Sequence, residues 1–306
     1  MFPTDFELYK PYIVTGLALG GVYALSGVGI VVLYRATGVL NLAFGAIGAM
    51  GALISWTLIE HTSFPDWASY LVCIAFGGLV TFAYGVIFGP PLARRDPLVK
   101  AMGTVGLTLI LLGLMSYFWP PKSRSMFLPT SDWRYYIGFA GVDITWTQIT
   151  SLVFGVFVTL GVGAFLRYTK LGTAMRALAD DREITSTLGV PVRRVEAAAW
   201  LGSGLIAGAA GLLLSDLVSL DAVNLTYLVF ASLAAALIAR LQSLVVTLLA
   251  GIVVGLCTAL LTPILLWPSP SYSLSGYRYA APFVIAIITL LFLARRRVVS
   301  VSRTEH

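Results

Sequence analysis

The sequence predicts an all-α, polytopic helical membrane protein. Of its 306 residues, 58% are hydrophobic and only 11% are charged, whereas soluble domains carry about 25% charged residues. The apolar residues gather in repeated runs of at least about 18 residues, which is the length that crosses a bilayer as a helix. The runs lack the short alternating pattern of a membrane barrel. We therefore expect one membrane domain that comprises residues 1–306.

The hydrophobic pattern divides the chain into apolar segments that we expect to form eight or nine membrane segments. The second is rich in glycine, which favours a broken helix, and the seventh is short, which favours a tilted or re-entrant one. Whether these two cross the bilayer fully is left open. The nine segments are 11–34, 38–59, 68–92, 100–119, 147–167, 195–215, 226–239, 244–267 and 279–294.

The distribution of Lys and Arg predicts the orientation of these segments. Fifteen of the twenty basic residues fall on one side of the predicted topology, and cytoplasmic loops carry an excess of positive charge. The N-terminus is then outside and the C-terminus cytoplasmic, and the net charge of +6 does not call for a nucleic-acid partner. The fifteen are Arg35, Arg94, Arg95, Lys100, Arg167, Lys170, Arg176, Arg182, Arg193, Arg194, Arg240, Arg295, Arg296, Arg297 and Arg303.

Ionisable residues are missing from the middle of every predicted segment. Proton relays and ion-coupled pumps usually need such groups within the membrane, and an intramembrane hydrolase needs a positioned acid, base or metal. His61 and His306 are the only histidines, so no metal site is expected. The sequence also lacks a Gly-rich ATP-binding motif of the Walker type. We expect a non-enzymatic chain that binds no cofactor, so that any Mg-ATP that drives it is bound by a partner subunit.

The most polar stretch, residues 167–194, lies between two apolar segments. Leu171, Met175 and Leu178 fall at the spacing of one helical stripe. Gly189 suits a left-handed helix end, and Pro191 blocks continuation. The stretch therefore predicts a short amphipathic helix in a basic loop. It is either a solvated connection or a contact surface for another protein.

The same stretch resembles the cytoplasmic loop of permease subunits in branched-chain amino acid ABC importers. In that family the loop contacts the ATP-hydrolysing subunit. The resemblance implies that residues 168–193 form a coupling loop or helix within a single permease domain. The matching positions are Gly172, Arg176, Ala177, Asp180, Asp181, Leu188 and Gly189.

A second informative stretch, residues 33–51, places the polar Asn41 inside a glycine-rich apolar segment. Irregular backbone at membrane depth is tolerated where protein buries it or where it lines a cavity. Asn41 therefore either bonds to a neighbouring helix or lies near a solute route. The stretch resembles the N-terminal signature of the same permease family, which implies that Asn41, Phe44 and Gly45 lie on the substrate pathway. That pattern usually has His where this chain has Phe44, so a less polar route is expected.

The resemblance also implies the partners and the location of the chain. They are ATP-binding subunits, a second homologous permease subunit and an extracytoplasmic substrate-binding protein, in the lipid of the inner membrane. The expected solute is a branched-chain amino acid or a related small polar or amphipathic molecule. A stand-alone secondary transporter or channel is the alternative function, and a membrane scaffold is a third. The loop 120–146 is either a connector or a docking surface for the extracytoplasmic partner.

Two further patterns concern packing. Three glycine pairs spaced four residues apart predict close helix contacts. They are Gly16 with Gly20, Gly204 with Gly208, and Gly251 with Gly255. The family commonly has a Gly-rich turn before its penultimate segments, and this chain has residues 239–243 there, without glycine.

Overall fold

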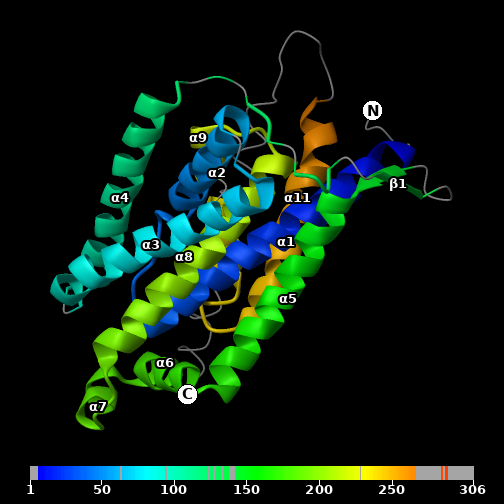
Figure 1. Ribbon diagram of the computed structural model, residues 1–306. Helices are drawn as coiled ribbons and strands as arrows, with labels where there is room; N and C mark the ends of the chain where they lie inside the picture. Colours follow the sequence, from blue (N-terminus) through cyan, green and yellow to red (C-terminus); the bar gives the residue numbers. More distant parts are fainter. Residues whose placement is uncertain are drawn as a thin grey trace, which may run out of the picture.

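The computed structural model describes residues 6–62, 64–93, 95–120, 122, 124–126, 128–131, 134–137, 142–227, 229–266, 284, 287 and 288. These residues form mainly helices, together with two short strands (Figure 1). The helices are α1 (Phe6–Thr37), α2 (Phe44–His61), α3 (Asp66–Leu92), α4 (Pro97–Phe118), α5 (Trp146–Tyr168), α6 (Lys170–Asp180), α7 (Arg182–Thr187), α8 (Val192–Leu217), α9 (Ala222–Tyr227), α10 (Val229–Ile238) and α11 (Leu244–Leu266). The strands are β1 (Arg134–Ile137) and β2 (Val142–Thr145).

Within the described residues, six helices are long and apolar enough to cross a membrane, namely α1, α3, α4, α5, α8 and α11. Each corresponds to one predicted segment. The prediction of a helical, multi-pass membrane protein is therefore confirmed. The ninth segment, 279–294, lies outside the described residues apart from three isolated positions. A total of eight or nine segments stays a prediction.

The second segment is interrupted. Backbone without helical structure separates α1 from α2, and Gly38 begins it with a φ of 66°. Thr104 of α4 holds this break in place, because its hydroxyl oxygen accepts a hydrogen bond from the Leu42 N–H (3.1 Å) and lies 3.0 Å from the Leu40 carbonyl oxygen. The seventh segment, 226–239, falls in the apolar helical stretch Ala222–Ile238, which contains α9 and α10 and is shorter than the six long helices. The broken second segment is as predicted.

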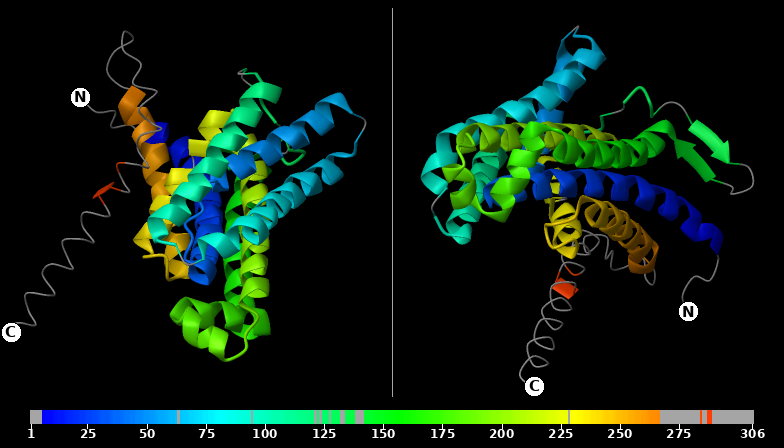
Figure 2. Two further views of the ribbon diagram at one scale, coloured as in Figure 1. Left: turned by 90° about the vertical axis from the view of Figure 1, so that its left-hand side faces the viewer. Right: turned by 90° about the horizontal axis from the view of Figure 1, so that it is seen from below.

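The loop 120–146 adds one small strand element to the predicted all-α fold. Strands β1 and β2 pair there as an antiparallel hairpin, with Arg134 opposite Thr145 and Ile137 opposite Val142. The hairpin extends beyond the helical bundle (Figure 2, right). Both runs contain aromatic or β-branched residues, which favour strands. They are also too short to have registered as membrane segments.

Helix α1 forms the centre of the bundle. It packs against α11, α5, α8 and α10 (Figure 1). The protein buries 89% of the apolar window of α1, but only 17% of the corresponding window of α4. A helix that is apolar all round is stable where other helices cover it on all sides. The arrangement leaves α4 as a peripheral helix with apolar side chains on its exposed face.

Glycines form the closest helix contacts, as predicted. A Cβ added to Gly20 of α1 would lie 2.7 Å from the Ile252 Cα of α11, and Gly255 faces the Gly20 backbone. A Cβ added to Gly208 of α8 would lie 2.6 Å from the Cys73 carbonyl oxygen of α3. Because these distances are below van der Waals contact, the backbones can approach only where side chains are absent.

The turn between α10 and α11 contains two non-glycine residues in the left-handed conformation, Arg240 with a φ of 53° and Leu241 with a φ of 57°. Their position is that of the Gly-rich turn expected in the family. Leu241 packs against the core, whereas Arg240 is exposed. Arg35 ties the turn to α1, since its guanidinium donates a hydrogen bond to the Gln242 carbonyl (3.1 Å).

We expect Arg240→Gly to be more stable than Arg240→Ala by about 1 kcal/mol, because only glycine adopts a positive φ without a steric cost. Both variants lose the same charge, so their difference isolates the backbone. Thermal unfolding in detergent measures it. The same pair of substitutions at Arg193, an exposed helical position in α8, should give the opposite sign. A less stable glycine variant at position 240 would contradict the assigned backbone.

Candidate functional site: an end surface and a cavity joined by α8

Helices α6 and α7 lie across one end of the bundle (Figures 1 and 2). A cap begins each helix. The Thr169 hydroxyl accepts a hydrogen bond from the Gly172 N–H (3.0 Å), and the Asp181 carboxylate accepts one from the Ile184 N–H (2.9 Å). The single helix predicted for this stretch is therefore two short helices, because Asp181 ends α6 and caps α7.

The inner face of α6 packs on the membrane helices. Met175 and Leu178 are buried and Leu171 packs against the same core, which confirms the predicted stripe. Gly172 also faces inward, where an added Cβ would lie 2.5 Å from the Leu166 Cα of α5. Gly172 is thus a packing residue that seats α6 against the last turn of α5.

The outer face presents an exposed apolar pair. Ile184 is 61% exposed and Leu188 is 77% exposed. Leu188 directly follows α7, and its N–H donates a hydrogen bond to the Ile184 carbonyl (3.2 Å), so the two side chains lie on one side of the helix end. The exposed carboxylates of Asp180 and Asp181 lie next to them in the chain. Exposed apolar side chains with a polar rim mark interaction sites. We call these four residues and their surroundings the α6–α7 surface.

The remaining predicted positions divide between this surface and its support. Ala177 is partly buried, and its carbonyl accepts a hydrogen bond from the Thr185 hydroxyl (2.9 Å), which joins α6 to α7. Arg176 is partly buried, with its Nε atom enclosed and unbonded among the described residues. Gly189 has a φ of 80° and open space around it. The predicted left-handed helix end is therefore confirmed.

An ion pair connects α7 to the membrane helix α8. Arg182 lies 2.5 Å from the carboxylate of Glu196, which is buried one turn into α8. Lys100 of α4 is within electrostatic range of both. Ile184 and this pair were missed from the sequence, although Ile184 has the helical spacing to Leu188. The ion pair fixes the position of α7 relative to α8, while the side chains of Ile184 and Leu188 stay exposed.

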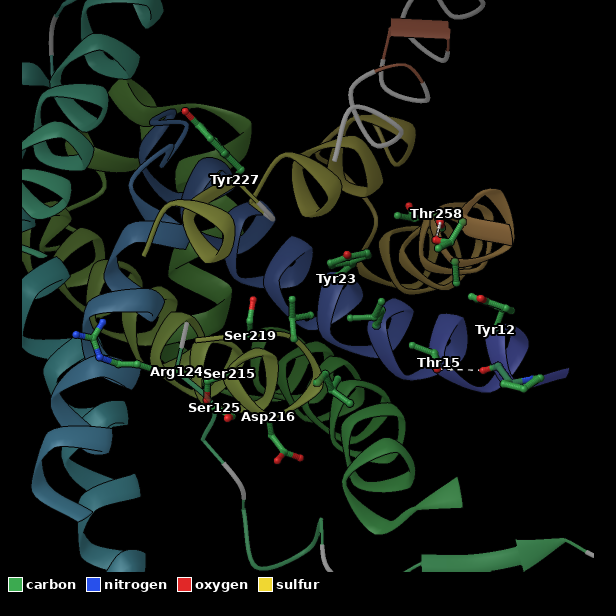
Figure 3. A pocket seen from close by; sticks show the side chains of 16 residues that line it. Tyr12, Thr15, Tyr23, Arg124, Ser125, Ser215, Asp216, Ser219, Tyr227 and Thr258 are labelled. Atoms are coloured by element: carbon green, nitrogen blue, oxygen red, sulfur yellow. Dashed lines mark hydrogen bonds between the residues drawn. The ribbon is translucent and has the colours of Figure 1, made fainter. Parts of the chain in front are cut away.

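A cavity of about 540 Å³ lies at the opposite end of the bundle (Figure 3). Helix α1 contributes Tyr12, Thr15 and Tyr23 to its wall, and α11 contributes Thr258. The C-terminal end of α8 and the segment after it supply a third wall that includes Ser215. Helix α8 therefore extends from the α6–α7 surface to this cavity, which we call the end cavity.

The three predicted pathway residues lie apart from the end cavity. Phe44 is buried and, with Gly45, lines a second space of only about 10 Å³. A Cβ added to Gly45 would lie 2.5 Å from the Thr226 carbonyl oxygen, so α2 and α9 touch there. The Asn41 side-chain oxygen accepts a hydrogen bond from the Ala43 N–H (3.1 Å), while its Nδ2 atom is buried and unbonded among the described residues.

The two spaces follow one another along the bundle. Tyr23 lines the end cavity and Ser26, one turn further along α1, lines the small space. On α8, Ser215 lines the first and Leu214 the second. A space of this size holds about one water molecule at most. The packing around Phe44 and Gly45 therefore leaves no room for a solute in the small space next to the end cavity.

Comparison with known proteins agrees with this architecture. The LivH protein of Escherichia coli strain K12, a high-affinity branched-chain amino acid transport system permease protein, is 24% identical over 302 residues, which cover 94% of this chain and 95% of LivH. The BraD permease protein of Pseudomonas aeruginosa is 26% identical over 216 residues, or 67% of this chain and 70% of BraD. The LivM permease protein of Salmonella typhimurium is 26% identical over 215 residues, or 63% of this chain and 49% of LivM.

A family described as "Branched-chain amino acid transport system / permease component" matches residues 12–294. This range includes α1 except for its first residues, the other five described membrane helices, the α6–α7 surface, and the residues that line both spaces apart from Pro11. A transport permease is itself not a catalyst, and it resides in a membrane through multiple helices, six of which are described here. The chain belongs to the family of permease components of branched-chain amino acid transport systems.

Proposed function

We propose that this chain is the membrane permease subunit of an ATP-driven ABC importer, and that the α6–α7 surface couples it to an ATP-binding subunit. The observation that carries the proposal is the exposed pair Ile184 and Leu188, on a helix anchored by Arg182 to Glu196 of α8. A force applied to α7 reaches α8, whose other end lines the end cavity. The charges of Asp180 and Asp181 at the rim determine how the partner is aligned on this surface more than they increase the affinity.

The proposal includes the orientation of the chain. The break after α1 and the turns after α3, α5 and α10 lie at the end that carries α6 and α7 (Figure 1). These are the segments with the excess of Arg and Lys. By the positive-inside rule that end is cytoplasmic and the end cavity opens outside. The N-terminus is then outside, the C-terminus is cytoplasmic, and eight or nine segments form one permease domain of residues 1–306.

The proposed assembly follows the family. Mg-ATP binds to the ATP-binding subunits, and an extracytoplasmic substrate-binding protein delivers the solute. A second permease subunit completes the pathway, and the similarity to both LivH and LivM supports a pair of related permeases. The solute is a branched-chain amino acid or a related small amphipathic molecule.

Uptake by proteoliposomes that contain the chain with its partner subunits tests this function. We expect accumulation of radiolabelled leucine, isoleucine or valine only when ATP and the substrate-binding protein are both supplied. Uptake that depends on an ion gradient and not on ATP would favour the alternative of a secondary transporter. Passive equilibration that needs neither would favour a channel.

We further propose that the solute route continues from the end cavity past Phe44 and Gly45, beside the break that contains Asn41. The Phe44 ring lies against Gly29, where an added Cβ would meet the ring at 2.7 Å and the Ile206 side chain at 3.1 Å. The closed contact is then the narrow point that opens during transport. Phe44 makes this point apolar where the family usually has His.

We expect Phe44→His to change the relative uptake rates of leucine, valine and a more polar amino acid, because it places a hydrogen-bonding ring at the narrow point. Association with the ATP-binding subunits should remain at the parent level, since Phe44 is buried and does not belong to the α6–α7 surface. Competition uptake and affinity copurification measure the two effects. Phe88→His, at an exposed aromatic position on α3, is the control. Unchanged relative rates for every solute would remove Phe44 from the route.

A further inference from the structure

Four of the hydroxyl groups on the wall of the end cavity donate their hydrogens to backbone carbonyls. The Thr15 hydroxyl donates to the Pro11 carbonyl (3.0 Å), and the Thr258 hydroxyl donates to the Val254 carbonyl (2.7 Å). Thr262 donates to the Thr258 carbonyl (3.3 Å) and Ser215 to the Leu212 carbonyl (2.7 Å). A hydroxyl has one hydrogen and two lone pairs. These four groups therefore offer a solute acceptor oxygens only.

One of the two charged side chains described on the cavity wall also offers acceptor oxygens only. Asp216 lies at its edge, where the carboxylate accepts a hydrogen bond from the Leu128 N–H (3.1 Å), and a carboxylate can only accept. Arg124 is the one obligate donor among the described lining side chains. Its guanidinium extends away from the threonines and lies 5.2 Å from the ring centroid of Trp56 (Figure 3). The tyrosines and the remaining serines can donate or accept.

We infer that the end cavity binds the primary ammonium group of the solute. Residues with acceptor oxygens line the cavity from two helices, Thr15 from α1 and Thr258 and Thr262 from α11. An ammonium group has three donors and no acceptor, so it suits these oxygens. A carboxylate needs donors, and these hydroxyl groups have already donated their hydrogens to the backbone. The inference deepens the proposed function and rests on it, because it takes the end cavity as the start of the solute route.

The cavity distinguishes solutes by this chemistry. A site that hydrogen-bonds a donor group rejects an analogue that lacks it, because the acceptors of the site are then left unpaired. An amino acid that enters with its ammonium group against α1 and α11 leaves its apolar side chain beside Leu19 and Ala259, which are also on the wall. The 2-oxo acid of the same carbon skeleton is excluded for lack of a donor.

The inference can be tested without measuring transport. A ligand bound in the cavity should protect a cysteine placed there from reaction with a thiol reagent. Ser219 lines the cavity and is exposed, so Ser219→Cys reports on its occupancy. Cys257→Ser removes the exposed native thiol, and Cys73 is buried. The probes are isopentylamine, which has the ammonium group alone, and 4-methylpentanoate, which has the carboxylate alone. Each is added to the complete purified transporter before a thiol reagent.

We expect isopentylamine to slow the labelling at least about tenfold at saturation and 4-methylpentanoate to leave it unchanged. Thr15→Val combined with Thr258→Val should raise the concentration of isopentylamine needed for protection by roughly a hundredfold, because each hydrogen bond to a charged group contributes about tenfold or more. Thr15→Ser combined with Thr258→Ser keeps both oxygens and should preserve it. Equal or stronger protection by the carboxylate, protection that survives in the valine variant, or its loss in the serine variant would each overturn the inference.

The outcome is separate from that of the proposed function. Protection requires neither ATP nor a substrate-binding protein. A complex that fails to accumulate leucine but shows protection by isopentylamine would contradict the importer and keep the ammonium site. A complex that accumulates leucine but shows no such protection would keep the importer and remove the site.

Discussion

Gly204→Val should prevent the membrane domain from folding. Gly204 lies where α8 crosses α3, and an added Cβ would overlap the Thr81 hydroxyl oxygen and the Gly77 carbonyl oxygen. Thr81 cannot turn away freely, because its hydroxyl bonds to the carbonyls of its own helix at Gly77 and Gly78. Overpacking of a tight core costs about 1–3 kcal/mol and more where backbone must move. We expect loss of the folded, detergent-stable protein.

Gly202→Val is the matched control. Gly202 is in the same helix two residues earlier, and an added Cβ would meet nothing within 4 Å. The two substitutions have the same helix propensity cost, so only the contact with α3 differs. Size-exclusion chromatography of the solubilised variants measures the result. A monodisperse Gly204→Val protein with the thermal stability of Gly202→Val would show that α3 and α8 do not cross as described.

Ile184→Asp combined with Leu188→Asp should abolish association with the ATP-binding subunits while the chain still folds. Both side chains are exposed, so their removal takes nothing from the membrane core. Burial of each in an interface contributes about 1.5–3 kcal/mol. Their combined loss weakens the complex by at least roughly a hundredfold, before repulsion from the new charges is counted. Copurification and substrate-stimulated ATP hydrolysis measure the effect.

The control for this pair is Ser186→Asp. Ser186 is an exposed residue of the same short helix, and its substitution adds negative charge without removing an apolar contact. We expect near-parent association for Ser186→Asp. If the double variant associates as well as this control, the apolar pair is not the contact.

The sequence predicted the long helices well, because apolar runs of membrane length leave few alternatives. It also predicted the glycine contacts, since Gly204 and Gly208 of α8 do meet α3. The hairpin of β1 and β2 was missed, because strands of four residues have little periodicity to detect. The glycine-rich second segment indicated a break, but its position could not be read, because the hydroxyl of Thr104 that holds it comes from a distant helix.

The sequence predicted the location of the α6–α7 surface but not which residues face outward. Gly172 matched the family pattern, yet the structure uses it to seat α6 on α5. Ile184 belonged to no motif and is exposed because Asp181 restarts the helix and turns α7 in a new direction. The ion pair of Arg182 with Glu196 joins residues on two helices. The end cavity likewise depends on tertiary packing, since its walls come from three parts of the chain.

Cross-linking from Leu188 tests the central claim most directly, because it reports both the side of the membrane and the partner. Leu188→Cys is made with Cys257→Ser, so that buried Cys73 is the remaining native thiol. The account predicts that an impermeant thiol reagent labels position 188 in inside-out vesicles but not in intact cells, and that a short bifunctional reagent joins it to an ATP-binding subunit. Labelling of intact cells, or cross-linked products that contain no ATP-binding subunit, would contradict the account.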